Sequence, residues 1–186
     1  MNTNIYLQNG LVIWFTGLSG AGKSTLSNML NDEISNHVKI LDGDEVRENL
    51  SPDLDFSKAG RSENIRRISY VSKCIVDCSG IVIVAAISPY LEDRKKAKDI
   101  IGRDRFFEIF VDCSIEKLIE RDVKGLYAKA ISGEIKNFTG ISDPYEKPES
   151  YDCYVDTGNQ SVEESMEIIK KTLKEFLESN TSEYFI

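Results

Sequence analysis

A glycine-rich segment near the start of the chain has the residue types and spacing of a phosphate-binding loop. Residues 17–24 read G-L-S-G-A-G-K-S and fit G-x-x-x-x-G-K-[ST] at every fixed position. Such glycines let consecutive N–H groups point at phosphate oxygens, and the following helix adds its N-terminal positive charge. We expect Lys23 to reach the β- and γ-phosphates and Ser24 to ligate Mg²⁺. A chance glycine-rich turn is the alternative, but the expected flanking strand and helix favour phosphate binding.

Two carboxylates follow the second expected strand. Asp42 and Asp44 flank Gly43, and the carboxyl ends of parallel strands meet at one edge of a sheet. Carboxylates there can hold the water shell of a metal and accept a proton from an attacking hydroxyl, as phosphoryl transfer requires. The alternative is a tight turn that caps the next helix. We favour the functional interpretation.

Basic and polar side chains farther along the chain are suited to a second anionic group. Arg61 and Asn64 lie on one helical turn, and guanidinium groups bind phosphate or sulfate at two points. Ser88 follows an apolar strand and projects toward the same crevice, although a Ser-Pro pair also starts turns. The arginines in this part of the chain are Arg47, Arg61, Arg66, Arg67, Arg94, Arg103, Arg105 and Arg121. We expect about half of them, Arg103 and Arg105 among them, to be solvated surface residues.

A long polar stretch, residues 122–150, interleaves basic and aromatic residues. As a mobile lid it would exclude water from the γ-phosphate, with Lys124 stabilising negative charge and Phe138 stacking on a base. A solvated loop is the alternative.

Short apolar runs alternate with amphipathic segments and position these groups. Strands are expected at 11–16, 38–41, 81–87, 107–111 and near 154–155, and helices at 23–34, 63–78, 92–101, 114–121 and 162–178. A polar loop is expected over residues 51–60. Strands alternating with helices predict an α/β fold, a doubly wound parallel sheet with helices on both faces. Ligands then bind beyond the carboxyl ends of the strands.

Length and composition limit the classes of function. The chain has 186 residues, 23 Lys and Arg against 31 Asp and Glu, and a net charge of −8. We expect one domain over residues 1–186, and no broad binding to nucleic acid or to an anionic membrane, because both need a basic surface. Residues 1–10 lack a secretory pattern, no apolar run is long enough for a membrane helix, and residues 179–186 read as a tail. We therefore expect a cytoplasmic protein.

The four cysteines form no C-x-x-C pair, which argues against a zinc site or a thioredoxin-like motif. We expect Cys74 and Cys78 to be buried as small apolar side chains. Guanine-specific N-K-x-D and transporter-type L-S-G-G-Q motifs are absent from the sequence, which favours a kinase of small molecules.

Taken together, seven motifs closely resemble the adenylylsulfate kinase family over residues 14–162. Members of that family use ATP to phosphorylate the ribose 3′-hydroxyl of adenosine 5′-phosphosulfate (APS), giving 3′-phosphoadenosine 5′-phosphosulfate (PAPS). The later motifs are more specific than the phosphate loop. The motifs are G-L-S-G-A-G-K-S-T at 17–25, L-D-G-D-x-V-R at 41–47, D-L-x-F-S at 53–57, R-x-x-N-I-R-R at 61–67, I-S-P-Y at 87–90, R-D-V-K-G-L-Y at 121–127 and G-E-I-K-x-F-T-G-I at 133–141.

The resemblance implies a role for each matching residue. Asp44 would polarise the 3′-hydroxyl, Phe56 and Phe138 would sandwich the acceptor adenine, and Lys124 would close on the acceptor. Family descriptions mark the serine at position 88 as a phosphoserine intermediate, but in-line transfer needs none, so we expect Ser88 to line the pocket. The catalytic residues implied are Lys23, Asp44, Ser88 and Lys124. The ATP site would comprise Gly17, Leu18, Ser19, Gly20, Ala21, Gly22, Lys23, Ser24, Thr25 and Arg121. The APS site would comprise Asp44, Arg47, Phe56, Arg61, Asn64, Ile87, Ser88, Lys124 and Phe138, and Mg²⁺ would be held by Ser24 and Asp42.

The chain also departs from the family pattern. Residues 141–145 read I-S-D-P-Y where the family reads I-D-S-P-Y, and residues 148–154 differ from the usual proline-rich form. Both segments are expected near the adenine of ATP. We expect no fused sulfurylase domain and therefore expect APS to come from a separate ATP sulfurylase. The family resemblance implies a homodimer.

Two other functions stay open at this point. One is a related kinase that acts on another nucleotide-like acceptor, such as a cytidine diphosphate derivative. The other is a non-catalytic nucleotide-binding subunit, against which the intact Lys23, Ser24 and Asp44 argue.

Overall fold

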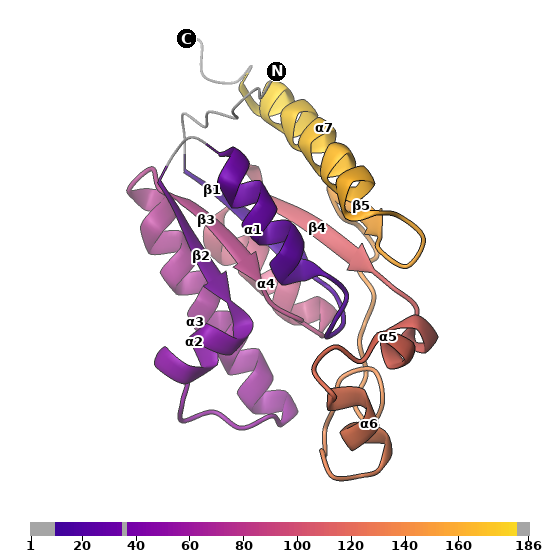
Figure 1. The fold of residues 1–186 in the computed structure, drawn as a ribbon. Helices are drawn as coiled ribbons and strands as arrows, with labels where there is room; N and C mark the ends of the chain where they lie inside the picture. The colour runs from indigo at the N-terminus through magenta and orange to yellow at the C-terminus, as the bar shows by residue number, and fades with distance from the viewer. Residues whose placement is uncertain (1–9, 35–36, 182–186) are drawn as a thin grey trace.

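A five-stranded parallel sheet forms the centre of the computed structural model, which describes residues 10–34 and 37–181. The strands are β1 Leu11–Thr16, β2 Val38–Asp42, β3 Ile81–Ala85, β4 Phe106–Asp112 and β5 Cys153–Asp156. Their order is β2-β3-β1-β4-β5 (Figure 1). In β1, Ile13 lies opposite Ile83 of β3 and Phe107 of β4. The expected α/β fold with a parallel sheet is confirmed.

Helices cover both faces of this sheet (Figure 1). Helices α1 Lys23–Glu33 and α7 Val162–Thr181 pack on one face, and α3 Lys58–Asp77 and α4 Leu91–Ile101 pack on the other. Successive side chains of a strand point to opposite faces. Accordingly, Ile13 and Phe15 belong to the core beneath α1 and α7, while Val12 and Trp14 belong to the core beneath α3 and α4. Burial on both sides explains why β1 is apolar at nearly every position.

Three short helices lie beyond the carboxyl ends of the strands (Figure 1). They are α2 Gly43–Asn49, α5 Ile115–Arg121 and α6 Leu126–Ile131. Elsewhere, a 3₁₀ turn over Arg103–Arg105 directly precedes β4. Helix α2 was not expected, and it begins because the Asp42 carboxylate caps the N–H of Asp44 at 3.0 Å. Helix α6 was not expected either. The Asp122 carboxylate caps it by accepting from the N–H groups of Tyr127 at 2.9 Å and Ala128 at 3.0 Å.

Helix α3 differs most from its expected boundaries and burial. It begins at Lys58 rather than residue 63, because Ser57 caps it by accepting from the N–H of Gly60 at 3.1 Å. Its C-terminal buried positions are Ser72 and Val76, so the predicted burial of Cys74 and Cys78 is wrong, and both cysteines are exposed. Ile65 and Ile68 of the predicted apolar stripe are buried, and Val71 and Ile75 pack against the same core. Cys78 is the C-cap residue, beyond the last turn of the helix.

Other boundaries shift by a few residues. Strand β3 ends at Ala85 rather than 87, and β4 extends the expected strand at both ends. Helix α7 runs to Thr181, so the expectation of a tail from residue 179 is wrong for its first three residues. The rest of the expected tail, residues 182–186, and residues 1–9, on which the expectation of no signal peptide bears, lie outside the described residues. Of the helices in the described part of the chain, none has the length and apolar character needed to cross a bilayer.

Candidate active site

The phosphate-binding loop joins the carboxyl end of β1 to the first residue of α1. Gly17 and Gly22 have φ of 154° and 100°, in the positive region that favours glycine. A side chain at Gly17 would also collide with the carbonyl oxygen of Val111, because the loop runs directly over β4. The loop therefore requires glycine at both positions, and its shape presents backbone N–H groups to an anion.

Lys23 folds back over this loop. Its ammonium donates to the carbonyls of Gly17 at 2.9 Å and Leu18 at 2.7 Å. The side chain is buried, and burial lowers its pKa from 10.5 to about 8. A phosphate group in the loop would give this buried ammonium a negatively charged partner.

Asp42 connects the phosphate-binding loop to α2. Its Oδ2 accepts from the Ser24 hydroxyl at 2.7 Å, while its Oδ1 caps Asp44. The two interpretations of Asp42, a helix cap and a functional carboxylate, are therefore compatible, because each carboxylate oxygen serves one of them. A hydroxyl and a carboxylate open to a cleft are the hard oxygen ligands that Mg²⁺ prefers, with phosphate oxygens and waters completing its shell. Within the described residues there is no cluster of three or more His, Cys, Asp or Glu side chains that could hold a metal by itself.

Asp44 and Lys124 face each other at the mouth of the cleft. The Lys124 ammonium lies 2.7 Å from Asp44 Oδ2, and both side chains are exposed. The hydrogen bond with Asp44 raises the pKa of Lys124. This contact joins α2 to the segment between α5 and α6, because the two residues are 80 positions apart in the chain.

Two arginines converge on one aromatic ring. The guanidinium carbon of Arg47 lies 4.3 Å, and that of Arg61 5.5 Å, from the ring centre of Phe56. Burial and the neighbouring Arg61 lower the pKa of Arg47, and burial lowers that of Arg61. Two cations held this close, on a ring that is 56% exposed, make a corner suited to an anionic group attached to a flat base.

One cleft of about 290 Å³ brings these groups together. Asn64 lines it and is only 6% exposed, and its Oδ1 has no hydrogen-bond partner. A buried amide oxygen without a partner is costly in a folded protein, so the cleft is built to receive a donor there. The other predicted site residues that line the cleft are Ser19, Gly20, Gly22, Lys23, Ser24, Thr25, Asp42, Asp44, Arg47, Phe56, Arg61, Ile87, Ser88 and Lys124.

Ser88 contributes to the cleft wall but is held tightly from behind. Its hydroxyl accepts from the Trp14 indole N–H at 3.0 Å, and its side chain is 1% exposed. Its φ of 48° is left-handed, and its carbonyl accepts from the buried Arg94 at 2.5 Å. The Ile87 carbonyl accepts from Thr16 Oγ1 at 2.7 Å. These contacts fix the loop after β3 beside the phosphate-binding loop.

Comparison with known proteins identifies the family. A protein-family model described as Adenylylsulphate kinase matches residues 9–156. The chain belongs to the adenylylsulfate kinase family. It is 52% identical over 167 residues to the Adenylyl-sulfate kinase of Oceanobacillus iheyensis, covering 88% of this chain and 84% of that protein. It is 55% identical over 170 residues to Probable bifunctional SAT/APS kinase 2 of Sorangium cellulosum, covering 90% of this chain and 29% of that longer protein.

Solved structures agree with this membership. The Mycobacterium tuberculosis APS kinase, in complex with AMPPNP and APS, has a TM-score of 0.81 and 41% identity, covering 90% of this chain and 99% of that one. A gluconokinase from Sinorhizobium meliloti, with 14% identity and a TM-score of 0.64, shares the fold.

Five residues assigned from the adenylylsulfate kinase motifs do not line the main cleft. Three of them, Gly17, Leu18 and Ala21, belong to the phosphate-binding loop, and the other two are Phe138 and Arg121. Phe138 packs edge-to-face on Tyr127, with ring centres 5.0 Å apart. The structure thus places Phe56 on the cleft wall and Phe138 against α6. Arg121 donates to the Thr157 carbonyl at 2.7 Å and lines a small hollow with Ser19 and Gly20. This hollow adjoins the phosphate-binding loop at Ser19 and Gly20.

Several residues support this adenylylsulfate kinase site without having been singled out. The Tyr127 hydroxyl donates to the Ser19 carbonyl at 2.9 Å, and the Thr157 hydroxyl donates to the Ala21 carbonyl at 2.8 Å. Both steady the phosphate-binding loop. Tyr127 belongs to the R-D-V-K-G-L-Y motif and could have been found there, whereas no local pattern marks Thr157.

Proposed function

We propose that this chain transfers the γ-phosphoryl group of ATP to the ribose 3′-hydroxyl of APS, forming ADP and PAPS. One observation carries the proposal. A single cleft holds a phosphate-binding loop at one end and, at the other, a carboxylate, two arginines on an aromatic ring and an unpaired buried amide. The first set matches a nucleoside triphosphate, and the second matches a nucleotide that carries an anionic tail.

Each residue of the acceptor end has a distinct task. Arg47 and Arg61 bind the phosphosulfate, Phe56 stacks on the adenine, and Asn64 accepts a hydrogen bond from the acceptor. Asp44 accepts a hydrogen bond from the 3′-hydroxyl and orients its oxygen toward the γ-phosphorus. Lys124, which pairs with Asp44 at 2.7 Å, is placed to stabilise the charge of the transferring group once the acceptor takes its place on the carboxylate.

At the nucleotide end, Lys23 and the loop N–H groups hold the β- and γ-phosphates. Ser24 and Asp42 would hold Mg²⁺, which would neutralise phosphate charge. The transfer is direct and in line, from ATP to the acceptor oxygen. Arg121 packs near the nucleoside of ATP, and Phe138 joins Phe56 around the acceptor adenine after movement of the lid over residues 122–150.

Partners follow from the reaction. An ATP sulfurylase supplies APS, and the name of the bifunctional Sorangium cellulosum relative supports a coupling of the kinase to a second activity. The homodimer is part of the same proposal, and a sizing measurement in solution decides it.

The test is incubation with Mg-ATP and APS, followed by separation of ADP and PAPS. A matched pair of variants assigns the role of Asp44. Asp44→Ala lowers kcat by about 10²-fold or more, the scale of a positioned acid–base group. Glu45→Ala, in the same turn but paired with Lys39 at 3.3 Å, leaves kcat unchanged. Turnover with a cytidine diphosphate derivative in place of APS overturns the proposed acceptor, and no turnover with either overturns catalysis.

A further inference from the structure

The segment 50–56, here called the acceptor loop, lies between α2 and α3 and lines the cleft through Phe56. It carries the exposed Phe56 ring at its end. Its carbonyls at Leu54 and Asp55 accept from Arg47 Nη1 at 3.2 and 2.9 Å. The positions of Phe56 and of the Arg47 guanidinium therefore both depend on where this loop lies.

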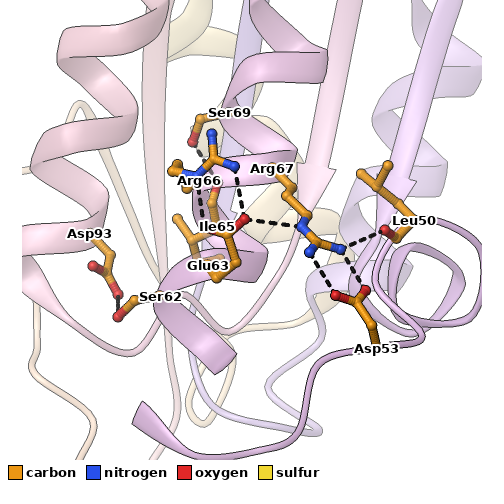
Figure 2. Close-up of polar contacts among 9 residues, drawn as sticks. All are labelled: Leu50, Asp53, Ser62, Glu63, Ile65, Arg66, Arg67, Ser69 and Asp93. Atoms are coloured by element: carbon orange, nitrogen blue, oxygen red, sulfur yellow. Dashed lines mark hydrogen bonds and ion pairs between the residues drawn. The ribbon is translucent and has the colours of Figure 1, made fainter. Parts of the chain in front are cut away.

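Arg67 on α3 holds the acceptor loop at two points (Figure 2). Its Nη1 donates to the Leu50 carbonyl at 3.1 Å and to Asp53 Oδ1 at 2.6 Å, and its Nη2 donates to Asp53 Oδ2 at 2.7 Å. Its Nε donates to Glu63, one turn earlier on α3, at 3.1 Å. The guanidinium is thus fixed to the helix on one side and to the loop on the other.

This arrangement needs an arginine. The four hydrogen bonds use most of the donors of one planar group, and a lysine ammonium cannot reproduce the two-point contact with Asp53. Hydrogen bonds from Arg66 and Arg67 lower the pKa of Glu63 to about 2, and the bond from Arg67 lowers the pKa of Asp53. Both carboxylates therefore stay charged at the pH at which the protein works.

Arg66 is a natural comparison because it precedes Arg67 in the same turn. It donates to the same Glu63 carboxylate at 2.7 and 2.8 Å. Figure 2 shows it turned away from the acceptor loop, with Asp53 and Leu50 reached by Arg67. The two arginines share a helix, a partner and a charge, and they differ in contact with the loop.

We propose that Arg67 is a positioning residue for acceptor binding, which fixes the acceptor loop so that Phe56 and Arg47 meet the nucleotide acceptor. It does not touch the acceptor itself. The inference rests on the proposed function, since it assigns this loop to APS. Loosening the loop then weakens the acceptor site and leaves the phosphate-binding loop, built on β1 and α1, as it was.

Steady-state kinetics of Arg67→Ala and Arg67→Lys, with Arg66→Ala as the control, test the proposal. We expect the KM for APS to rise about tenfold in both Arg67 variants, as small misplacements of binding groups do. The KM for ATP stays within about twofold, and Arg66→Ala changes neither value by more than about twofold. Asp53→Ala also raises the KM for APS, and the double variant adds little to Arg67→Ala, because both single variants remove the contact between Arg67 and Asp53.

Hydrogen–deuterium exchange gives a readout that does not depend on the acceptor. The N–H of Ser51 donates to the Val46 carbonyl of α2 at 3.0 Å, and the N–H of Leu54 donates to the Ser51 carbonyl at 3.2 Å. Their exchange accelerates in Arg67→Ala and not in Arg66→Ala. An unchanged APS KM, an equal rise in the Arg66→Ala control, or an equal rise in the KM for ATP overturns the proposal. Failure of the unmodified protein to use APS overturns the proposed function instead, and the exchange comparison still tests the positioning.

Discussion

Replacing Ser88 by alanine separates direct phosphoryl transfer from transfer through a phosphoserine. The Ser88 hydroxyl accepts from the indole N–H of Trp14 at 3.0 Å, and the two side chains are 1% and 0% exposed. The hydroxyl is therefore bound to Trp14 in the core and exposes little surface to the cleft. Direct transfer predicts that Ser88→Ala keeps kcat within about tenfold of the unmodified protein, whereas a covalent intermediate predicts a loss of about 10³-fold or more.

The same variant has a structural cost that follows from the contact. Removing the hydroxyl leaves the buried Trp14 N–H without its acceptor, which costs about 1–3 kcal/mol of the free energy of unfolding. For a chain of this size the midpoint of thermal unfolding falls by about 2–12 °C. Ser88 also has a left-handed φ of 48°. Ser88→Gly removes the same hydroxyl but relieves this strain, so it is more stable than Ser88→Ala by about 1 kcal/mol.

The assay combines ADP release with thermal unfolding followed by far-ultraviolet circular dichroism. Circular dichroism is used because Trp14 is the single tryptophan of the chain, so a variant without it has no tryptophan emission to follow. Trp14→Phe serves as the partner variant, since it removes the donor and leaves the serine. The double variant should cost less than the sum of the two. A folded Ser88→Ala protein with kcat reduced by about 10³-fold refutes direct transfer. An unchanged midpoint of thermal unfolding shows that loss of the hydrogen bond to Trp14 does not cost about 1–3 kcal/mol.

Three further predictions concern the nucleotide, the metal and the acceptor. Burial lowers the pKa of Lys23 to about 8, and the protonated form binds phosphate, so kcat/KM for ATP falls as the pH rises above about 8. The unfolded chain keeps this proton up to about pH 10.5. The contribution of Lys23 to the free energy of unfolding therefore rises between about pH 8 and pH 10.5. Asp42→Asn keeps the helix cap but loses the charge, so the Mg²⁺ concentration for half-maximal activity rises about tenfold or more in a metal titration. Asn64→Leu removes a buried oxygen that has no partner, so thermal stability is kept or raised while the KM for APS rises about ten- to hundredfold.

Each of these predictions has an outcome that contradicts it. A kcat/KM profile for ATP that stays flat to pH 10 contradicts the lowered pKa of Lys23. Equal Mg²⁺ dependence of Asp42→Asn and the unmodified protein removes Asp42 from the metal site. An Asn64→Leu variant that loses stability and keeps its KM for APS assigns Asn64 to the fold rather than to the acceptor.

Much of the fold was predictable because local patterns determine it. The apolar run of β1 is buried on both faces, and its predicted boundaries at residues 11 and 16 are confirmed. The same holds for the phosphate-binding loop, since positive φ values and close approach to β4 restrict Gly17 and Gly22 to glycine. Helices α2 and α6 escaped prediction because their starts depend on capping by Asp42 and Asp122, and six or seven residues carry too little periodicity to be recognised.

Sequence by itself determined the kind of chemistry and the family, since the phosphate-binding loop and the later motifs are continuous stretches whose residue types carry their own meaning. The tertiary structure decided which side chains meet. Asp42 reaches Ser24 across 18 residues, Lys124 reaches Asp44 across 80, and Arg67 reaches Asp53 across 14. It also decided that Cys74 and Cys78, at the C-terminal end of α3, are exposed. The physical reason is that these contacts depend on the order of the strands and on the packing of helices against them, which no local spacing of residues encodes.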